Sequence, residues 1–486
     1  MTTGQRMEKP QGDVERIVKA INEAKPSSFH YKTWFTAGMG FFTDAYDLFI
    51  IGVVVSLLPF AGWHTLSIFQ KSLISSTSLI AAVVGATIFG RLLDKLGRKA
   101  VYGLELIILV IGALGSAFLT PVNGVDILIA WRFLLGVGIG GDYATSSVIM
   151  SEYSNTRSRG KFVGMVFSMQ SLGLVVGPLV ALAFLTTGVS PFLTWKLLLA
   201  IGALPAAVVI YYRRRMPEPP KYSAIVKGKA AKAARDLNNY ANINVAVDSQ
   251  DAKAKSHLSI IRMLTDTRLL ALIIGTAGSW FLMDWALYGN SIMANEMLGF
   301  LVPKSVTGLP YVIRTTEYSA LIFGVAAFPG YWLATFTMDR IGRKPIQILG
   351  FAMMAASFGI LGAFPFLASS AYVVQFLILY GVSYFFIEFG PNVTTFVYPP
   401  EVFPISARGT GSGFAAAGGK MGAFIGTFLN LFITANFHLS GLFVILSLLS
   451  AAGLLLTIFL LPEPKGRELE EISRDADYLE AVKGTE

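Results

Sequence analysis

Ionisable and hydrogen-bonding side chains stand inside long apolar segments of this sequence. Asp44 and Asp47 are three residues apart, so both carboxylates face the same side of a helix. Trp280, Asp284 and Tyr288 follow a spacing of four, which puts an indole, a carboxylate and a phenol on one stripe. A charged group costs about 3 kcal/mol at the centre of a membrane helix, so each one needs a reason to be there. The pattern indicates a polar site inside an otherwise apolar protein.

Further polar side chains share this setting. Glu388 and Asn392 are four residues apart and also lie on one helix face. Lys420 is flanked by glycines and suits either an anion ligand or a structural counter-ion to a buried aspartate. Asp142 and Gln170 complete the set, although a single buried aspartate can also be a structural hydrogen-bond anchor. By residue count, seven side chains fall near the middle of their segments: Asp44, Asp142, Gln170, Trp280, Asp284, Glu388 and Lys420.

These residue types indicate two kinds of chemistry. Two neighbouring carboxylates such as Asp44 and Asp47 do not both ionise readily in an apolar setting, which suits groups that bind and release protons. The indole and phenol of the other stripe are alone typical of packing, but beside Asp284 they favour a binding site. Glu105 and Arg132 lie nearer segment ends, so we expect them to form ion pairs or anchors.

Twelve apolar segments must position these side chains. The chain has 486 residues, of which 54% are hydrophobic and 14% charged, whereas about 25% are charged in a soluble domain. Because about 20 apolar residues cross a bilayer as a helix, the sequence predicts an all-α multi-pass protein of the cell membrane. The segments cover residues 33–59, 72–93, 100–120, 126–150, 161–184, 192–212, 268–291, 316–338, 346–367, 371–396, 410–433 and 439–461.

Lysine and arginine concentrate in loops that would all lie on one side of the membrane. They occupy the N-terminal segment, the loops after spans two, four and eight, and the tail. The net charge of +9 therefore reflects the positive-inside bias, so we expect cytoplasmic termini and no nucleic-acid partner. Residues 1–32 mix both charges and do not resemble a signal peptide. Val14, Ile17, Val18 and Ile21 predict a short amphipathic helix on the membrane surface.

The two halves of the chain repeat three motifs in the same order. An Asp-Xaa-Xaa-Gly-Arg-Lys loop follows spans two and eight, a Glu-to-Arg pair follows spans four and ten, and Pro-Glu-Pro follows spans six and twelve. This repetition predicts two six-helix halves with a site at their interface. We divide the chain into an N-terminal segment (1–32), a first half (33–212), a cytoplasmic linker (213–267), a second half (268–461) and a cytoplasmic tail (462–486).

The repeated loop charges are expected to act as a gate. Aspartates at helix ends can pair with arginine or with a neighbouring helix N-terminus, and such contacts can hold two halves together in one state. A plain glycine turn with solvated charges is the alternative for either copy, but the duplication favours gating. The predicted gating residues are Asp94, Arg98, Glu152, Arg159, Asp339, Arg343, Glu401 and Arg408.

At these loops the sequence resembles the major facilitator superfamily across all twelve spans. The Pro-Glu-Pro-Lys-Gly at residues 462–466 resembles its sugar-porter branch. A narrower resemblance lies in span four, where Gly140-Gly141-Asp142-Tyr143 and residues 149–153 are similar to the signature of the phosphate:proton symporters. Two departures are Ala144, where that family often has proline, and the added carboxylate Glu388.

The resemblance implies roles for the buried side chains. Spans one, four, seven and ten line the cavity in this fold. The family's phosphate-binding positions match Tyr143, Gln170, Trp280, Asp284, Tyr288, Asn392 and Lys420. Its proton-pathway acids match Asp44, Asp47 and Asp142, and we add Glu388 to these candidates.

The expected function is therefore import of inorganic phosphate coupled to protons, by alternating access. A small organic acid or a sugar is the alternative substrate, and a transporter-like nutrient sensor is a further alternative of another class. No nucleophile–base constellation or metal motif marks an enzyme, and the sequence contains no cysteine. We expect no cofactor and a monomer in the lipid bilayer, whose partners are the solute and protons.

Overall fold

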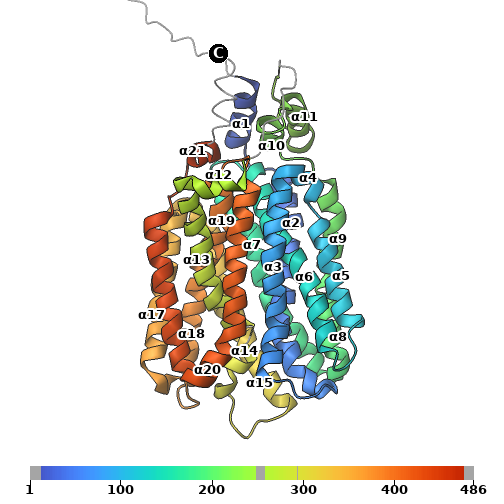
Figure 1. Ribbon diagram of the computed structural model, residues 1–486, viewed down its shortest axis with the longest axis vertical. Coiled ribbons are helices and arrows are strands. Elements are labelled where there is room, and N and C mark those ends of the chain that lie inside the picture. The colour runs from blue at the N-terminus through green and yellow to red at the C-terminus, as the bar shows by residue number, and fades with distance from the viewer. Residues whose placement is uncertain (1–11, 248–257, 293, 475–486) are drawn as a thin grey trace, which may run out of the picture.

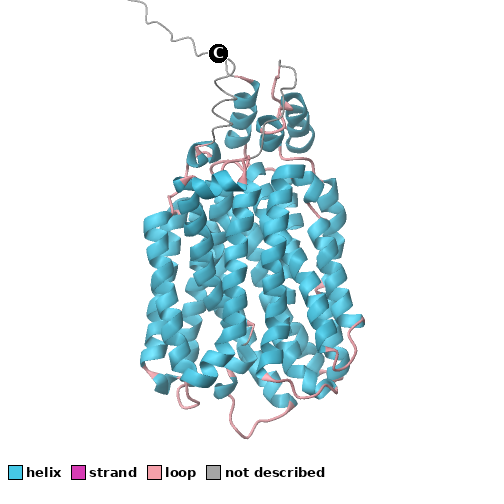
Figure 2. Cartoon of the chain, viewed as in Figure 1, coloured by secondary structure: helices cyan, strands magenta, loops and turns pink. Residues whose placement is uncertain are grey.

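Two bundles of long helices stand side by side (Figure 1). The computed structural model describes residues 12–247, 258–292 and 294–474, and this part of the chain is helical with connecting loops (Figure 2). Long apolar segments form helices because every backbone polar group must find a partner within the segment when lipid surrounds it. The fold therefore follows directly from the apolar segments of the sequence.

The first bundle contains spans one to six. Span six is broken at Gly202 into two helices. The elements are α2 (Ser28–Leu57), η1 (Leu58–Ala61), α3 (Ile68–Leu96), α4 (Arg98–Val101), α5 (Leu104–Phe118), α6 (Val125–Tyr153), α7 (Arg159–Thr186), α8 (Pro191–Ile201) and α9 (Ala203–Arg215).

The second bundle contains spans seven to twelve. Span eight is α15, η3 and α16, and span ten is α18, η5 and α19. The elements are α13 (Thr267–Ser291), α14 (Ala294–Met297), η2 (Gly299–Leu301), α15 (Leu309–Ile322), η3 (Phe323–Ala327), α16 (Phe328–Ile341), α17 (Arg343–Ala363), η4 (Pro365–Leu367), α18 (Val373–Ile387), η5 (Glu388–Asn392), α19 (Val393–Val402) and α20 (Arg408–Leu460).

The expected twelve spans are confirmed. Ten helices of the described chain are long and apolar enough to cross a membrane. One of them, α20, holds two spans because the chain turns at His438, whose φ of 59° is left-handed. The remaining span is the 29-residue α6, which carries the buried Arg132 and Asp142. Across the interface between the bundles, α3 packs on α20, and α7 packs on α15 and α16.

Span ten changes its helical geometry in the middle. The segment η5 is a π-helix that contains Gly390 and Pro391, and Gly390 has non-helical angles of φ −113° and ψ −117°. Proline lacks an N–H group and disrupts the regular backbone ladder, and such wide turns often occur at functional sites. The turn begins at Glu388 and ends at Asn392, so it sets the directions of both candidate side chains.

Short helices gather at one end of the molecule, which we call the linker end. They are α1 (Asp13–Glu23), α10 (Pro220–Ile225), α11 (Ala230–Ala241), α12 (Ile260–Thr265) and α21 (Leu469–Ser473), shown at the top of Figure 1. The prediction that the amphipathic helix α1 lies on the membrane surface is wrong. Its Ile17 and Ile21 are buried against Ala233 and Leu237 of α11, because the folded linker offers this stripe an apolar partner.

We predict that the linker end faces the cytoplasm. Because the sequence contains no cysteine, Lys229→Cys at the linker end and Thr65→Cys at the opposite end each supply a single exposed thiol. A membrane-impermeant maleimide added to intact cells should label the Thr65→Cys protein, and should label Lys229→Cys only after permeabilisation. The reverse pattern would contradict the orientation that the loop charges indicate.

Candidate functional site

A lysine–aspartate pair lies at the centre of the second bundle. Lys420 Nζ donates hydrogen bonds to Asp284 Oδ2 at 3.0 Å and to Tyr288 Oη at 2.9 Å. The ammonium also lies over the rings of Tyr143 and Tyr288, 4.0 and 4.1 Å from their centroids. All four side chains are buried, so the ion pair and the ring faces compensate a charge that water does not reach.

From this pair a chain of hydrogen bonds crosses the interface between the bundles. The phenol oxygens of Tyr288 and Tyr143 are 2.9 Å apart, and the Gln170 amide donates to Tyr143. Tyr331 donates to Gln170 Oε1 at 2.9 Å, and Asn392 donates to Tyr331 at 2.7 Å. Asn392 also donates to Glu388, where the chain ends. We call this series from Asp284 to Glu388 the polar chain.

Some polar atoms along the polar chain have no hydrogen bond of normal geometry among the described residues. They include one carboxylate oxygen each on Asp284 and Glu388, the amide oxygen of Asn392 and the indole nitrogen of Trp280. Trp280 is nevertheless close to the chain, because its ring centroid lies 6.0 Å from that of Tyr143. Buried polar atoms are normally paired, so unpaired donors and acceptors grouped in one place indicate a ligand site.

Aromatic rings cover this site toward both ends of the molecule. On the linker side, Phe167 stacks on Phe396 with centroids 4.5 Å apart, and Phe41 packs edge-on to both. On the opposite side, Phe49 stacks on Tyr288 at 5.1 Å. Phe41 and Phe49 are eight residues apart on α2, or about 12 Å along the helix. The site is therefore enclosed between two aromatic layers.

The acidic residues of the first bundle surround an arginine that the sequence analysis assigned to the linker. Arg213 lies in the last turn of α9 and is fully buried. Its Nη1 is 2.6 Å from Asp142 Oδ1 and 2.9 Å from Glu105 Oε1, and its Nη2 donates to Asp142 Oδ2 at 3.0 Å. The assignment was wrong because a run of three arginines is typical of a cytoplasmic loop, whereas the first arginine here turns inward.

The two aspartates of span one differ in their surroundings. Asp44 and Asp47 are fully buried, and none of their four carboxylate oxygens has a hydrogen-bond partner among the described residues. The charges of Asp142, Arg213, Asp47 and Lys420 act on Asp44, so this carboxylate is coupled electrostatically to the acidic cluster and to the polar chain. Arg132 donates to the backbone oxygen of Asp47 at 3.0 Å, as expected for an anchoring residue.

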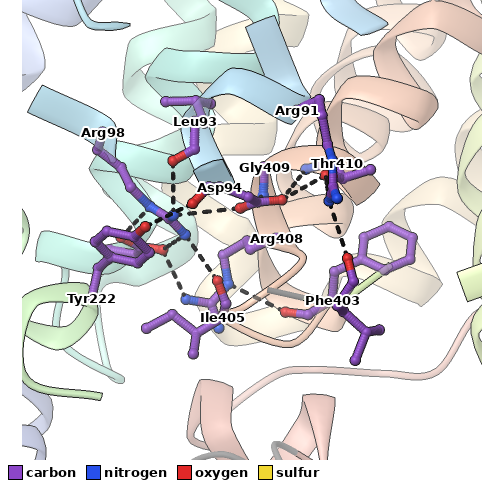
Figure 3. Close-up of polar contacts among 12 residues, drawn as sticks. Arg91, Leu93, Asp94, Arg98, Tyr222, Phe403, Ile405, Arg408, Gly409 and Thr410 are labelled. Atoms are coloured by element: carbon purple, nitrogen blue, oxygen red, sulfur yellow. Dashed lines mark hydrogen bonds and ion pairs between the residues drawn. The ribbon is translucent and has the colours of Figure 1, made fainter. Parts of the chain in front are cut away.

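At the linker end, a first lock joins the bundles through a carboxylate of the first half. Asp94 accepts hydrogen bonds from the backbone N–H groups of Gly409 at 3.0 Å and Thr410 at 2.7 Å, at the N-terminus of α20 (Figure 3). Glu152 accepts from Arg98 at 2.8 Å and from Arg408 at 3.3 Å. A carboxylate at a helix N-terminus is stabilised by the helix dipole, so this contact holds the halves together.

A second lock repeats the arrangement with the halves exchanged. Asp339 of the second half accepts from Gly160 N at 3.1 Å and Lys161 N at 2.8 Å, at the N-terminus of α7. Glu401 accepts from Arg159 at 2.8 Å and from Arg343 at 2.7 Å. The structure thus brings the eight predicted gating residues together as two clusters of four. Both clusters cross the interface between the halves.

The Pro-Glu-Pro motifs complete each lock. Glu218 accepts from the backbone N–H of Arg98 at 2.6 Å, and Glu463 accepts from that of Arg343 at 3.1 Å. Each glutamate therefore caps the helix that follows the glycine turn of its own half. The halves also meet at the opposite end, where Lys71 Nζ and Glu296 Oε1 form an ion pair at 2.6 Å.

Comparisons with known proteins agree with this arrangement. Residues 33–476 match the model of the family described as sugar (and other) transporters. A probable inorganic phosphate transporter 1-12 of Oryza sativa subsp. japonica is 36% identical, covering 96% of this chain and 95% of that one. The low affinity inorganic phosphate transporter 4 of Medicago truncatula is also 36% identical, with 94% of each chain covered.

The chain belongs to the sugar (and other) transporter family.

Solved structures show the same fold. The proton:xylose symporter XylE of the major facilitator superfamily, bound to 6-bromo-6-deoxy-D-glucose, superposes with a TM-score of 0.75 at 20% identity. The alignment covers 93% of this chain and 99% of that one. This member of the family is therefore a multi-pass membrane transporter with the major facilitator fold, and it is not an enzyme.

The structure groups most of the predicted site residues of this transporter. Six of the seven binding candidates lie in the polar chain, and Trp280 lies beside it. Lys420 pairs with Asp284, as expected for a counter-ion to a buried aspartate, so the added carboxylate of Glu388 has no lysine partner among the described residues. Sequence reasoning missed Tyr331 and Arg213. A single tyrosine in an apolar segment is usually a packing residue, so the sequence around Tyr331 did not indicate a binding role.

We predict that weakening one lock opens the linker end. Asp94→Asn removes the charge that faces the N-terminus of α20, an interaction worth about 1 kcal/mol, so opening should become about fivefold more frequent. In purified protein, the buried thiol of Ser151→Cys, beside Pro400 of the other half, should then react about fivefold faster with maleimide. Asp126→Asn at the opposite end is the matched control, and equal rates in both backgrounds would contradict a gating role.

Proposed function

We propose that this transporter imports inorganic phosphate together with protons by alternating access. The observation that carries the proposal is the polar chain, in which one ammonium, three phenols and two amides extend from Asp284 across the interface of the halves. The names of the Oryza and Medicago relatives support phosphate as the substrate class. A site at the interface is also where both halves can act on a bound solute.

The chemistry of the polar chain suits a partly protonated anion. Phosphate at neutral pH has oxygens that accept from Lys420, tyrosine and Trp280 donors, and it keeps at least one O–H group. The free oxygen of Asp284 can accept a hydrogen bond from that group. Sulfate has no proton at this pH, so its oxygens would face the carboxylate without a hydrogen bond, which disfavours its binding.

The buried acids supply the proposed proton sites. We propose that Asp44, Asp47, Asp142 and Glu388 bind protons during the cycle. Asp44 and Glu388 have no ion-pair partner among the described residues, and an unpaired charge in an apolar interior costs more than protonation of the acid. Protonation of Asp44 would lower the negative charge between Asp142 and Lys420 before an anion arrives.

The proposed cycle joins these parts. A proton and phosphate enter from the side opposite the linker end, past Phe49. The halves then rock about the polar chain, the two locks part, and phosphate and proton leave at the linker end. The protein works in the lipid bilayer as a monomer, with the solute and protons as its partners and no nucleic acid.

A porter of a small organic acid or a sugar is the alternative, and one observation favours it. Glu388 and Asn392 each have an oxygen without a hydrogen bond, and Lys420 pairs with Asp284 and not with Glu388. Two neighbouring acceptor oxygens suit the hydroxyl groups of a sugar or an organic acid better than an anion. A nutrient-sensing role remains a further alternative and would show ligand binding without transport.

We predict phosphate uptake driven by a pH gradient. Proteoliposomes with an acidic exterior should accumulate labelled phosphate, and a protonophore should abolish the accumulation. Asp142→Asn should remove the dependence on the gradient because the carboxylate can no longer bind a proton. Asp126→Asn serves as a control of the same chemistry outside the site. Uptake that ignores the gradient in the unmodified protein would rule out the symport proposal.

We further predict that Asp284 sets the selectivity between phosphate and sulfate. Asp284→Asn replaces an acceptor that repels sulfate with a neutral amide, so competition by sulfate should increase about tenfold, or about 1.4 kcal/mol. The measurement is inhibition of labelled phosphate uptake by sulfate, sugars and carboxylates. Glu388→Gln in the same assay tests the alternative, because a loss of inhibition by sugars or carboxylates there would favour those substrates over phosphate.

A further inference from the structure

The buried Arg213 has no role in the proposed cycle described above, although many contacts hold its side chain in the first half. Besides the two carboxylates, it donates to the backbone oxygens of Thr36 at 3.3 Å and Ala37 at 2.8 Å on α2. Its guanidinium also lies over the ring of Tyr102, 4.6 Å from the centroid. The side chain is therefore held on all sides by α2, α5 and α6, inside the bundle.

The contact with Asp142 involves both oxygens of the carboxylate. Two N–H groups of Arg213 point at Oδ1 and Oδ2, a bidentate geometry that requires the ionised acid, because a protonated oxygen would present a hydrogen to an N–H group. Ser146 donates to Oδ1 as well, at 2.5 Å. Arg213 and a proton therefore compete for the same oxygens of Asp142.

The charges that face Asp142 leave room for one proton. From α9 it meets Arg213, from α5 Glu105, and from α2 Asp44, while Tyr102 lies beside the same cluster. The single guanidinium of Arg213 pairs with two carboxylates, those of Asp142 and Glu105. These three groups together carry a net charge of −1 when both acids are ionised. Uptake of one proton makes the three groups neutral overall, which favours their burial.

Arg213 is also close in sequence to the first lock. Glu218, which caps the helix at Arg98, lies five positions further along the chain. Arg98 pairs with Glu152, and Glu152 also contacts Arg408 of the other half. Glu152 and Asp142 lie ten residues apart on α6, about 15 Å along the helix. A shift of the linker end as the halves part would thus pull on the backbone next to Arg213.

We propose that Arg213 is a positioning residue that sets proton coupling by acting as the exchangeable counter-ion of Asp142. This inference rests on the proposed proton-coupled transport. In the closed linker end, Arg213 holds Asp142 ionised. When a proton adds to one oxygen of Asp142, its hydrogen bond with Arg213 breaks. The guanidinium keeps its own proton and its contacts with Glu105 and the α2 carbonyls. Return of Arg213 to Asp142 expels the proton.

The test compares the pH dependence of uptake in three arginine variants. In proteoliposomes at fixed internal pH, the external pH that gives half-maximal phosphate uptake should rise by about one unit in Arg213→Gln, the size of effect that loss of a contacting opposite charge produces. Arg213→Lys keeps the charge with a single hydrogen bond and should give a smaller rise. Arg215→Gln is the matched control from the same run, since Arg215 contacts the ring of Tyr211 on the surface, and its midpoint should equal that of the unmodified protein.

A purely structural role would give another result. Loss of one partner from a buried ion pair destabilises a protein, so Arg213→Gln should melt at lower temperature, and Arg213→Gln with Asp142→Asn should recover part of that loss. An unchanged uptake midpoint in folded Arg213→Gln would overturn the inference. Where that variant does not fold, an unchanged midpoint in Arg213→Lys overturns it equally. Gradient-independent uptake by the unmodified protein would instead refute the proposed function itself.

Discussion

A charge buried in an apolar protein must meet an opposite charge, a helix terminus or a proton, and this constraint shapes the transporter at three depths. At the linker end, Asp94 and Asp339 meet helix N-termini of the opposite half. At the centre, Lys420 meets Asp284. Between them, Asp142 meets Arg213. Each of these contacts can be exchanged for another, because a buried carboxylate that loses its partner can be neutralised by a proton. The proposed movement of the halves and the proposed binding of protons therefore share one physical requirement.

The two locks, which we propose to act as a gate, exchange partners between the halves. Asp94 belongs to the first half and caps α20 of the second, while Asp339 belongs to the second and caps α7 of the first. The glutamates Glu152 and Glu401 add arginine pairs that also cross the interface. Closure at the linker end thus depends on geometry that the gene duplication supplied twice.

Much of this could be predicted from the sequence. The twelve spans follow from hydropathy, and the gate follows from the repeated motifs, whose positions are independent of fine packing. The polar chain follows in outline because polar side chains near mid-span are rare. Partner choice could not be predicted, because the depth of Lys420 does not say whether it turns toward Asp284 or Glu388. Tyr331 and Arg213 were missed since their residue types have commoner explanations, namely packing and loop charge. The apolar stripe of α1 likewise does not distinguish a lipid surface from the folded linker.

The two halves are alike at the linker end but differ at the centre of the molecule, and this difference matters for the proposed coupling of phosphate to protons. In the first half, the buried carboxylate of Asp142 pairs with an arginine, Arg213. In the second half, Asp284 pairs with a lysine, Lys420, and Asn392 lies in the same polar chain. The tyrosine pair Tyr143 and Tyr288 is one point where the two halves touch. The charges of Asp142 and Lys420 both act on Asp44, so a proton on Asp44 would change the field at the ammonium without direct contact. In an interior of low dielectric such a change acts over a longer distance than in water. In the proposed cycle, a proton bound in one half would alter the affinity for phosphate in the other half, so the proposed coupling needs no shared ligand.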